Sequence, residues 1–284
     1  MQLGPLDLWI LAATGVVAGG LGALLGIGGG LLVIPVLVLG LEVPARVAVG
    51  TGLVAVIATS TATGSVYVGR GLTNMRLAVT LELATTLGAT LAGAAVVLIP
   101  ERALLGMFAL LVLLTAALLA SRRGAGEALE GRPLVGPRGA EEIPGGLGGT
   151  YLDERTGRPV SYRVRRLPLG LAASAVAGAV SGLLGVGGGF LKVPAMTLGM
   201  GVPIKGAAAT SNFMIGVTAA AGLVVYERQG LVQPLLAAPV ALGVVAGALV
   251  GTRLAARVPS LVLARLLAVV LLVVAVQMGL RAVG

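Results

Sequence analysis

Two glycine-rich breaks stand at equivalent positions in two apolar segments of this 284-residue sequence. Residues 22–35 read Gly-Ala-Leu-Leu-Gly-Ile-Gly-Gly-Gly-Leu-Leu-Val-Ile-Pro, and residues 181–194 read Ser-Gly-Leu-Leu-Gly-Val-Gly-Gly-Gly-Phe-Leu-Lys-Val-Pro, at an offset of 159. A helix that restarts after such a break directs unpaired N–H groups and the positive end of its dipole at the break. Glycine lets an anion approach this backbone closely because no Cβ intervenes.

The two breaks together predict an anion-binding site near the middle of the molecule, since paired interruptions in two halves of a membrane protein point to a transport site. Its backbone residues are Gly26, Gly28, Gly29 and Gly30 in the first copy and Gly185, Gly187, Gly188 and Gly189 in the second. The alternative is that the glycines only allow close helix packing. Recurrence of the whole break, followed each time by proline, favours the site.

Hydroxyl and amide side chains follow each break and offer hydrogen bonds to an oxyanion. They are Thr51 in the first copy and Thr210, Ser211 and Asn212 in the second. The same groups can instead bond a carbonyl four residues back or a neighbouring helix, and both interpretations stay open. For the more distal hydroxyls, including Thr218, the structural interpretation is favoured.

Charged residues inside apolar segments are rare and functional by default. Lys192 follows the second break, where the first copy has Val33, and it is predicted to attract the anion; the alternative is that it snorkels to the membrane interface. Glu82 is the candidate carrier of a coupling proton, and the alternative is an interfacial acid paired with Arg76.

Composition indicates which elements must position these residues. The chain is 57% hydrophobic and 11% charged, far more apolar than a soluble domain. A membrane-spanning helix needs about 20 mostly apolar residues. The segments that qualify are about 8–40, 45–67, 77–99, 103–120, 167–200, 204–226, 231–252 and 260–281. The predicted fold is therefore an all-α membrane protein with about eight transmembrane helices in two pseudo-symmetric repeats, each with a glycine-broken first helix.

The repeats are predicted to span residues 1–120 and 167–284, with a polar loop at 121–166 between them. Residues 150–164 place two β-prone runs around a turn-rich centre, which predicts a small hairpin; a solvated linker is the alternative.

The topology depends on the short helix after each break. If it completes the crossing, the repeats are parallel; if it turns back, they are inverted. Arginine placement favours crossing, with both termini and the loop on one side, which the positive-inside rule makes cytoplasmic. The first apolar segment is interpreted as a retained span because no basic region precedes it.

Several classes of function are disfavoured. The chain has no cysteine and no histidine, and no acid pair at helical spacing inside a span, so we expect no metal, no cofactor and no enzymatic activity. Its net charge of +9 comes without a basic run interleaved with aromatic residues, so no nucleic-acid partner is expected. A passive anion channel is a less favoured alternative, because a channel needs no duplicated break.

The doubled break, its prolines Pro35 and Pro194, and the run Ala-Ala-Thr-Ser-Asn at 208–212 resemble the TauE/SafE sulfite-exporter family of membrane permeases. The resemblance covers both apolar halves. It implies two repeats of about four spans that move a sulfur-containing anion such as sulfite, a sulfonate or sulfoacetate. With a channel and an enzyme disfavoured, a proton-coupled secondary carrier in the cytoplasmic membrane is the leading mechanism. The expected partners are the small anion and the lipid bilayer; whether the protein is a monomer or a homodimer is left open.

Overall fold

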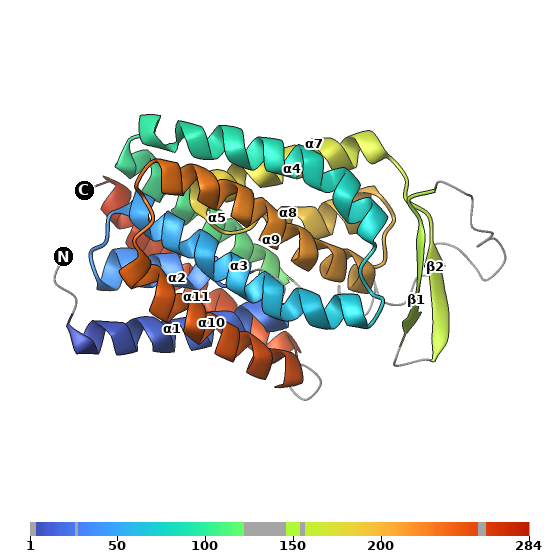
Figure 1. Cartoon of the computed structure of the whole chain (residues 1–284), viewed down its shortest axis with the longest axis horizontal. Helices are drawn as coiled ribbons and strands as arrows, with labels where there is room; N and C mark the ends of the chain where they lie inside the picture. Colours follow the sequence, from blue (N-terminus) through green and yellow to red (C-terminus); the bar gives the residue numbers. More distant parts are fainter. Residues whose placement is uncertain (1–3, 26–27, 122–145, 154–156, 255–259, 284) are drawn as a thin grey trace.

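The computed structural model of the chain describes residues 4–25, 28–121, 146–153, 157–254 and 260–283. Its first half is helical throughout (Figure 1). The elements are α1 (Pro5–Leu25), α2 (Gly30–Pro35), the π-helix η1 (Val36–Gly40), α3 (Ala45–Gly69), α4 (Met75–Ala95), the 3₁₀ turn η2 (Val96–Leu98) and α5 (Glu101–Ser121).

The second half follows a two-stranded hairpin and repeats the helical order of the first. The elements are β1 (Gly149–Asp153), β2 (Arg158–Tyr162), α7 (Leu167–Leu184), α8 (Gly189–Pro194), the π-helix η3 (Ala195–Gly199), α9 (Ile204–Arg228), α10 (Pro234–Leu254) and α11 (Ser260–Val283). From α2 onward, each helix that has a counterpart in the second half begins 159 residues before it. The offset read from the sequence is therefore also the offset of the secondary structure.

The all-helical membrane character is confirmed. Within the described residues, six helices are long and apolar enough to cross a membrane, and two shorter apolar helices cover Gly30–Gly40 and Leu267–Ala282. The outer faces of the long helices carry exposed leucines, such as Leu83, Leu87 and Leu91 along α4. Such a face is suited to lipid.

The expectation that the short helices complete a crossing is wrong, because both turn back. In the second half, the backbone N–H of Arg165, just before α7, donates to the carbonyl of Met200, just after η3, at 3.0 Å. In the first half, the end of η1 meets the end of the chain, where Arg281 Nη1 donates to the carbonyl of Val38 at 2.7 Å. Figure 1 shows both termini at one end of the molecule and the hairpin at the other.

Glycine faces allow two pairs of long helices to pack with their backbones nearly in contact. α4 packs along α7, and α1 packs along α10. A Cβ added at Gly178 of α7 would collide with the carbonyl oxygen of Thr85, and one at Gly19 of α1 would collide with that of Val244. Small residues are the usual means of close helix approach in lipid, where no hydrophobic force drives helices together.

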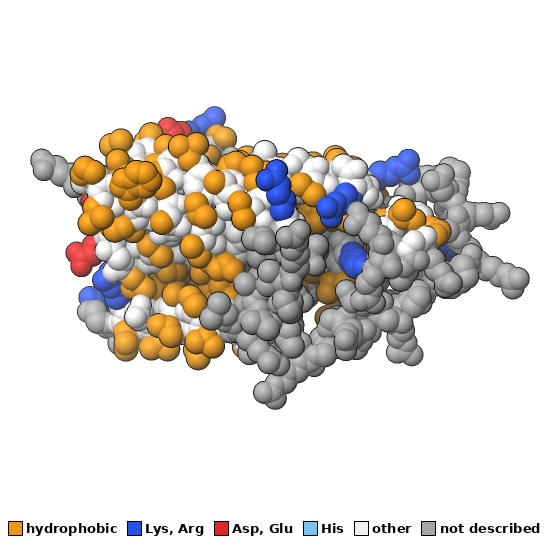
Figure 2. All heavy atoms as spheres, turned by 90° about the horizontal axis from the view of Figure 1, so that it is seen from below, with side chains coloured by type: hydrophobic (Ala, Val, Ile, Leu, Met, Phe, Trp, Pro, Cys, Tyr) orange, Lys and Arg blue, Asp and Glu red, His pale blue; other side chains and the backbone are white. Residues whose placement is uncertain are grey.

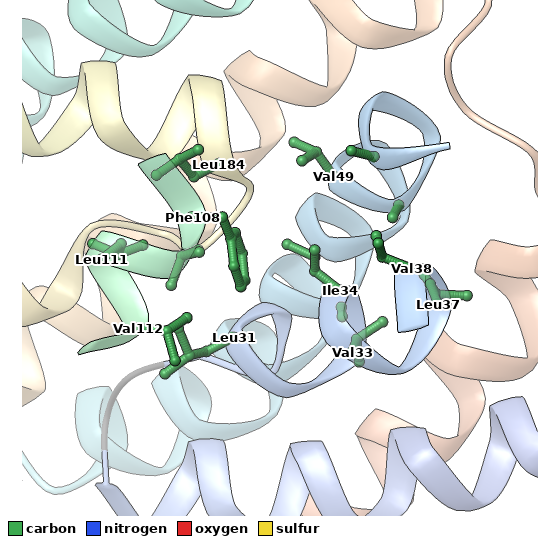
Figure 3. Packing of buried hydrophobic residues seen from close by; sticks show 14 of the residues in the cluster. Leu31, Val33, Ile34, Leu37, Val38, Val49, Phe108, Leu111, Val112 and Leu184 are labelled. Carbon is green, nitrogen blue, oxygen red and sulfur yellow. The ribbon is translucent and has the colours of Figure 1, made fainter. Parts of the chain in front are cut away.

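The short helix α2 is enclosed by apolar neighbours. Figure 3 shows Leu31 beside Val112 of α5, and Phe108 lying between Ile34 and Leu184. All of these residues are buried in one hydrophobic cluster. A re-entrant helix must bury its polar backbone inside the protein, and the apolar cover explains why the sequence of α2 has no polar side chain.

The predicted hairpin is confirmed. β1 and β2 pair antiparallel with Tyr151 opposite Val160. Tyr151 and Tyr162 are buried in a cluster with Met200 after η3. Asn74, between α3 and α4, donates to the Tyr162 hydroxyl at 3.1 Å. Burial raises the pKa of Tyr162, and the hydrogen bond from Asn74 opposes this shift, so the hydroxyl stays protonated at neutral pH.

Basic residues are unevenly distributed between the two ends. Among the described residues, Arg70, Arg76, Arg163, Arg165, Arg166 and Lys205 lie at the hairpin end. On the face drawn in Figure 2, apolar side chains cover most of the described surface, and most of the visible Lys and Arg side chains lie in the half that bears the hairpin.

The re-entrant topology predicts that the loop after η1 and the hairpin face opposite sides of the membrane. Because the chain has no cysteine, Glu42→Cys and Thr150→Cys each introduce a single exposed thiol. We expect a membrane-impermeant maleimide to label the two variants from opposite sides of oriented vesicles. Labelling of both from the same side would contradict the fold-back and restore the crossing topology.

Candidate functional site

A lysine and a threonine of the second half meet a glutamate of the first half inside the molecule. Lys192 of α8 donates from Nζ to the Thr218 hydroxyl of α9 at 2.9 Å. That hydroxyl lies 2.7 Å from Glu82 Oε1 of α4, and the Lys192 Nζ to Glu82 Oε2 distance is 3.8 Å. The side chains of Lys192 and Glu82 are 1% and 9% exposed. The three residues therefore form a buried ion pair bridged by a hydroxyl.

Local sequence explains how the cluster forms. Lys192 lies in the last turn of the short helix α8, and its own N–H donates to the carbonyl of Gly188, so the glycine break fixes where Lys192 lies along the molecule. Glu82 lies on the buried face of α4 with Leu81 and Thr85. Its repeat counterpart is Ala241, and that of Lys192 is Val33, so the pair joins the two halves once and the symmetry-equivalent pair is apolar.

The structure decides between the alternatives drawn for these two charges. Lys192 does not snorkel to the interface, because it is almost fully buried. Glu82 is paired with Lys192 in place of Arg76. Removing either charge would leave the other buried without compensation, which is far more costly than removing both.

Glu82 keeps one carboxylate oxygen free of hydrogen bonds. Oε1 accepts hydrogen bonds from the hydroxyl of Thr218 and, at 3.3 Å, from the hydroxyl of Thr86. Oε2 is buried and has no hydrogen-bond partner among the described residues. A buried carboxylate oxygen with no donor is the place in this cluster where a proton is most easily accommodated.

The two glycine breaks lie against each other at the centre of the molecule, as predicted. A Cβ added at Gly30 would collide with the carbonyl oxygen of Gly185. Val56 of α3 fills the space between the breaks, since a Cβ at Gly28 would lie 3.3 Å from Val56 Cγ2 and one at Gly187 would lie 2.9 Å from Val56 Cγ1. Gly187 also has φ +81°, which side chains disfavour. Gly26 lies outside the described residues.

The breaks are therefore closed in this conformation. Ile215 of α9, the repeat counterpart of Val56, also packs against Gly187. In this conformation the glycines allow close packing, which was the alternative considered for them. A ligand can reach their N–H groups only if Val56 and Ile215 move.

One hydroxyl in each repeat faces the start of a re-entrant helix. Thr59 of α3 accepts the backbone N–H of Gly29 at 3.1 Å, and its counterpart Thr218 accepts Lys192 Nζ. Sequence reasoning assigned Thr218 to a structural role and missed this contact. The signal was available, because Thr59 and Thr218 are an identical pair at the offset of 159.

The polar residues predicted to line the centre are only partly brought together. The Thr51 hydroxyl donates to the carbonyl of Val47 at 3.2 Å, and its chain neighbour Gly52 lies against Gly30 and Gly185 of the breaks. Thr210 instead accepts the N–H of Asn74 at 3.0 Å, at the hairpin end. Ser211 Oγ and Asn212 Oδ1 are buried without a hydrogen-bond partner among the described residues, so both retain capacity for a ligand.

A pocket of about 620 Å³ lies away from this cluster, at the end with the termini. Its lining residues are Val38, Glu42, Val43, Pro44, Glu101, Leu105, Leu280 and Arg281. None of these was predicted as a site residue. The pocket reaches the loop after η1, whereas the equivalent loop after η3 lies beside the hairpin, with Gly201 near the carbonyl of Arg163.

The buried pair predicts a non-additive response to mutation. Lys192→Met and Glu82→Gln should each destabilise the folded protein by about 3–5 kcal/mol, because each leaves an uncompensated buried charge. The double variant should be closer to the wild type than either single variant. Thermal unfolding of the four proteins in one detergent measures this, and additive losses in the double variant would show that the two side chains are not coupled.

Comparison with known proteins agrees with the geometry. A profile of the family described as Sulfite exporter TauE/SafE matches residues 11–278. A protein of Bacillus subtilis (strain 168) named "Probable membrane transporter protein YunE" is 29% identical over 244 residues, which cover 82% of this chain and 83% of the relative. A "Probable membrane transporter protein" of Xylella fastidiosa (strain 9a5c) is 30% identical over 238 residues, with coverage of 82% and 78%. No solved structure gave a significant match. The chain belongs to the sulfite exporter TauE/SafE family.

Proposed function

We propose that this protein is a secondary carrier that moves a small sulfur-containing anion, such as sulfite, a sulfonate or sulfoacetate, across the cytoplasmic membrane. Membership of the TauE/SafE family supports the substrate class. The observation that carries the proposal is Lys192, a buried cation placed by the second glycine break. A full ammonium adds to the roughly half charge that a helix N-terminus offers, and the sum favours a dehydrated anion.

The proposed substrate site comprises Lys192, the backbone of the two breaks, and Ser211 Oγ and Asn212 Oδ1, which have no hydrogen-bond partner among the described residues. In this conformation the Thr51 hydroxyl donates to the Val47 carbonyl and the Thr210 hydroxyl accepts the N–H of Asn74. The equal offset of the helices supports two repeats, and the fold-back of α2 and α8 supports their inversion. Inverted repeats exchange access between the two sides of a membrane by rocking around a central site. Val56 and Ile215 pack against the breaks, and Lys192, Ser211 and Asn212 are buried, so the proposed site is enclosed in this conformation.

In the proposed orientation the hairpin end faces the cytoplasm. The excess of Lys and Arg at this end supports the assignment under the positive-inside rule. Both termini then lie on the outer side. This orientation keeps the loop between the repeats on the cytoplasmic side, as the sequence predicted. It differs from the sequence prediction for the two termini, which were expected on the cytoplasmic side.

A passive anion channel is the alternative mechanism, and a carrier for another small organic anion is the alternative substrate. The closed centre favours a carrier, because a channel in its conducting state has a continuous path. Counterflow in liposomes distinguishes these possibilities. A carrier accelerates uptake of labelled sulfite, sulfoacetate, taurine or thiosulfate when the same anion is loaded inside, and a channel does not.

We expect Lys192→Met to weaken binding of the transported anion by at least tenfold, about 1.4 kcal/mol, and Lys192→Arg to retain part of the affinity. The matched control is Val33→Ile, which changes the equivalent position of the first repeat within its apolar surroundings and should leave affinity unchanged. Equilibrium binding at fixed ionic strength measures the effect. Equal affinities in the wild type and Lys192→Met would show that Lys192 does not contact the anion.

A further inference from the structure

We propose that Glu82 and the transported anion compete for Lys192, so that each anion binds together with one proton on Glu82. This inference rests on the proposed anion carrier and specifies its coupling. It makes the protein a proton–anion symporter, in which both ions occupy the site at once and move in the same direction.

The geometry of the cluster supports competition. The ammonium of Lys192 is fully enclosed, and its partners are the Thr218 hydroxyl at 2.9 Å and the Glu82 carboxylate at 3.8 Å. The Lys192–Glu82 contact is an ion pair held partly through Thr218, and its charged atoms are separated by more than a direct hydrogen bond. An anion that contacts Lys192 directly can therefore replace Glu82 as its partner.

Charge balance then requires a proton. Before the anion binds, Lys192 and Glu82 compensate each other. Once the anion has taken Lys192, an ionised Glu82 would remain as a second buried negative charge beside it, which low-dielectric surroundings penalise strongly. Protonation removes this charge. The proton comes from solvent, bonds to a carboxylate oxygen and leaves Lys192 as an ammonium. Oε2 is the receiving atom, because it has no hydrogen-bond donor to displace within the described structure.

No other charged group faces Glu82 from the described parts of the elements around it. α7 has no Lys, Arg, Asp or Glu over its whole length. The charged residues of α9 are confined to its two ends, at Lys205, Glu227 and Arg228. On α4 itself Arg76 lies in the first turn and is exposed. Lys192 is thus the charge that controls ionisation of Glu82, and the anion changes that ionisation by occupying Lys192.

Thr218 has the properties of a switch between the two states. Its single hydroxyl proton can be given to Glu82 Oε1 at 2.7 Å or to the carbonyl of Met214 at 2.9 Å. When Glu82 is ionised, Thr218 donates to it. When Glu82 is protonated and has turned from Lys192, the hydroxyl donates to Met214 and still accepts from Lys192. Both states therefore leave the hydroxyl satisfied.

The test combines proton uptake with the pH dependence of anion affinity in the full-length protein. The probe is thiosulfate or sulfoacetate, whichever the counterflow assay selects, since neither changes its own protonation between about pH 5 and pH 8. The chain has no histidine, so its unperturbed side chains contribute little in this range. We expect uptake of one proton per bound anion, measured in weakly buffered solution, and an affinity that falls about tenfold per pH unit above the pKa of Glu82.

Glu82→Gln imitates the protonated state and should bind the anion with an affinity that does not depend on pH, without proton uptake. The anion should also raise its melting temperature more than that of the wild type, because it restores a partner to Lys192. The matched control is Glu101→Gln, which removes a carboxylate that accepts the N–H of Ala45 at the far end of the molecule and should keep both proton uptake and pH slope.

Three outcomes would overturn the inference. Anion binding by the wild type without proton uptake contradicts the coupling and leaves the anion carrier intact. A pH slope that persists in Glu82→Gln places the proton on another group. Absence of binding to the wild type at every pH overturns the proposed function, and the coupling falls with it.

Discussion

A buried ammonium must always have a negative partner, and in this protein that requirement connects the fold to the proposed transport cycle. Lys192 is enclosed between α4, α8 and α9, and in the closed conformation its partner is Glu82. The pair can lie there only because α8 turns back into the molecule and because α4 approaches α7 closely enough to bring Glu82 inward. Both conditions depend on glycine, at the break and on the facing helix surface.

The two repeats share one architecture but contribute different groups to the site. In the first half, the re-entrant helix is packed by leucine, isoleucine and phenylalanine, and Val33 occupies the position of the lysine (Figure 3). In the second half, the equivalent position is charged, and a hairpin with no counterpart in the first half closes over the adjacent loop. The first repeat therefore contributes an apolar re-entrant helix and Glu82, and the second contributes Lys192 on the equivalent re-entrant helix. This asymmetry lets a pseudo-symmetric protein bind an anion in one orientation.

Sequence reasoning located the breaks, the hairpin, the helix offset and Lys192, because each is a local pattern of residue types. It failed where long-range packing decides. The fold-back of α2 and α8 was mispredicted from arginine placement, since the hairpin end keeps its positive excess in either topology. Lys192 and Glu82 form a pair although they lie 110 positions apart in the sequence. Their repeat counterparts, Val33 and Ala241, are uncharged, so comparison of the two repeats gives no sign that the residues pair. Thr51 and Thr210 match in sequence, yet Thr51 bonds within its own helix and Thr210 bonds Asn74 before α4.

Infrared difference spectroscopy on anion binding is the most direct test of exchange between Glu82 and the anion at Lys192. Adding the selected anion to the wild type at constant pH should produce the carbonyl stretch of a protonated carboxyl group and remove carboxylate absorption of equal magnitude. Both changes should be absent in Glu82→Gln. An anion-bound wild-type spectrum that keeps every carboxylate ionised, in protein shown to bind the anion, would contradict the account.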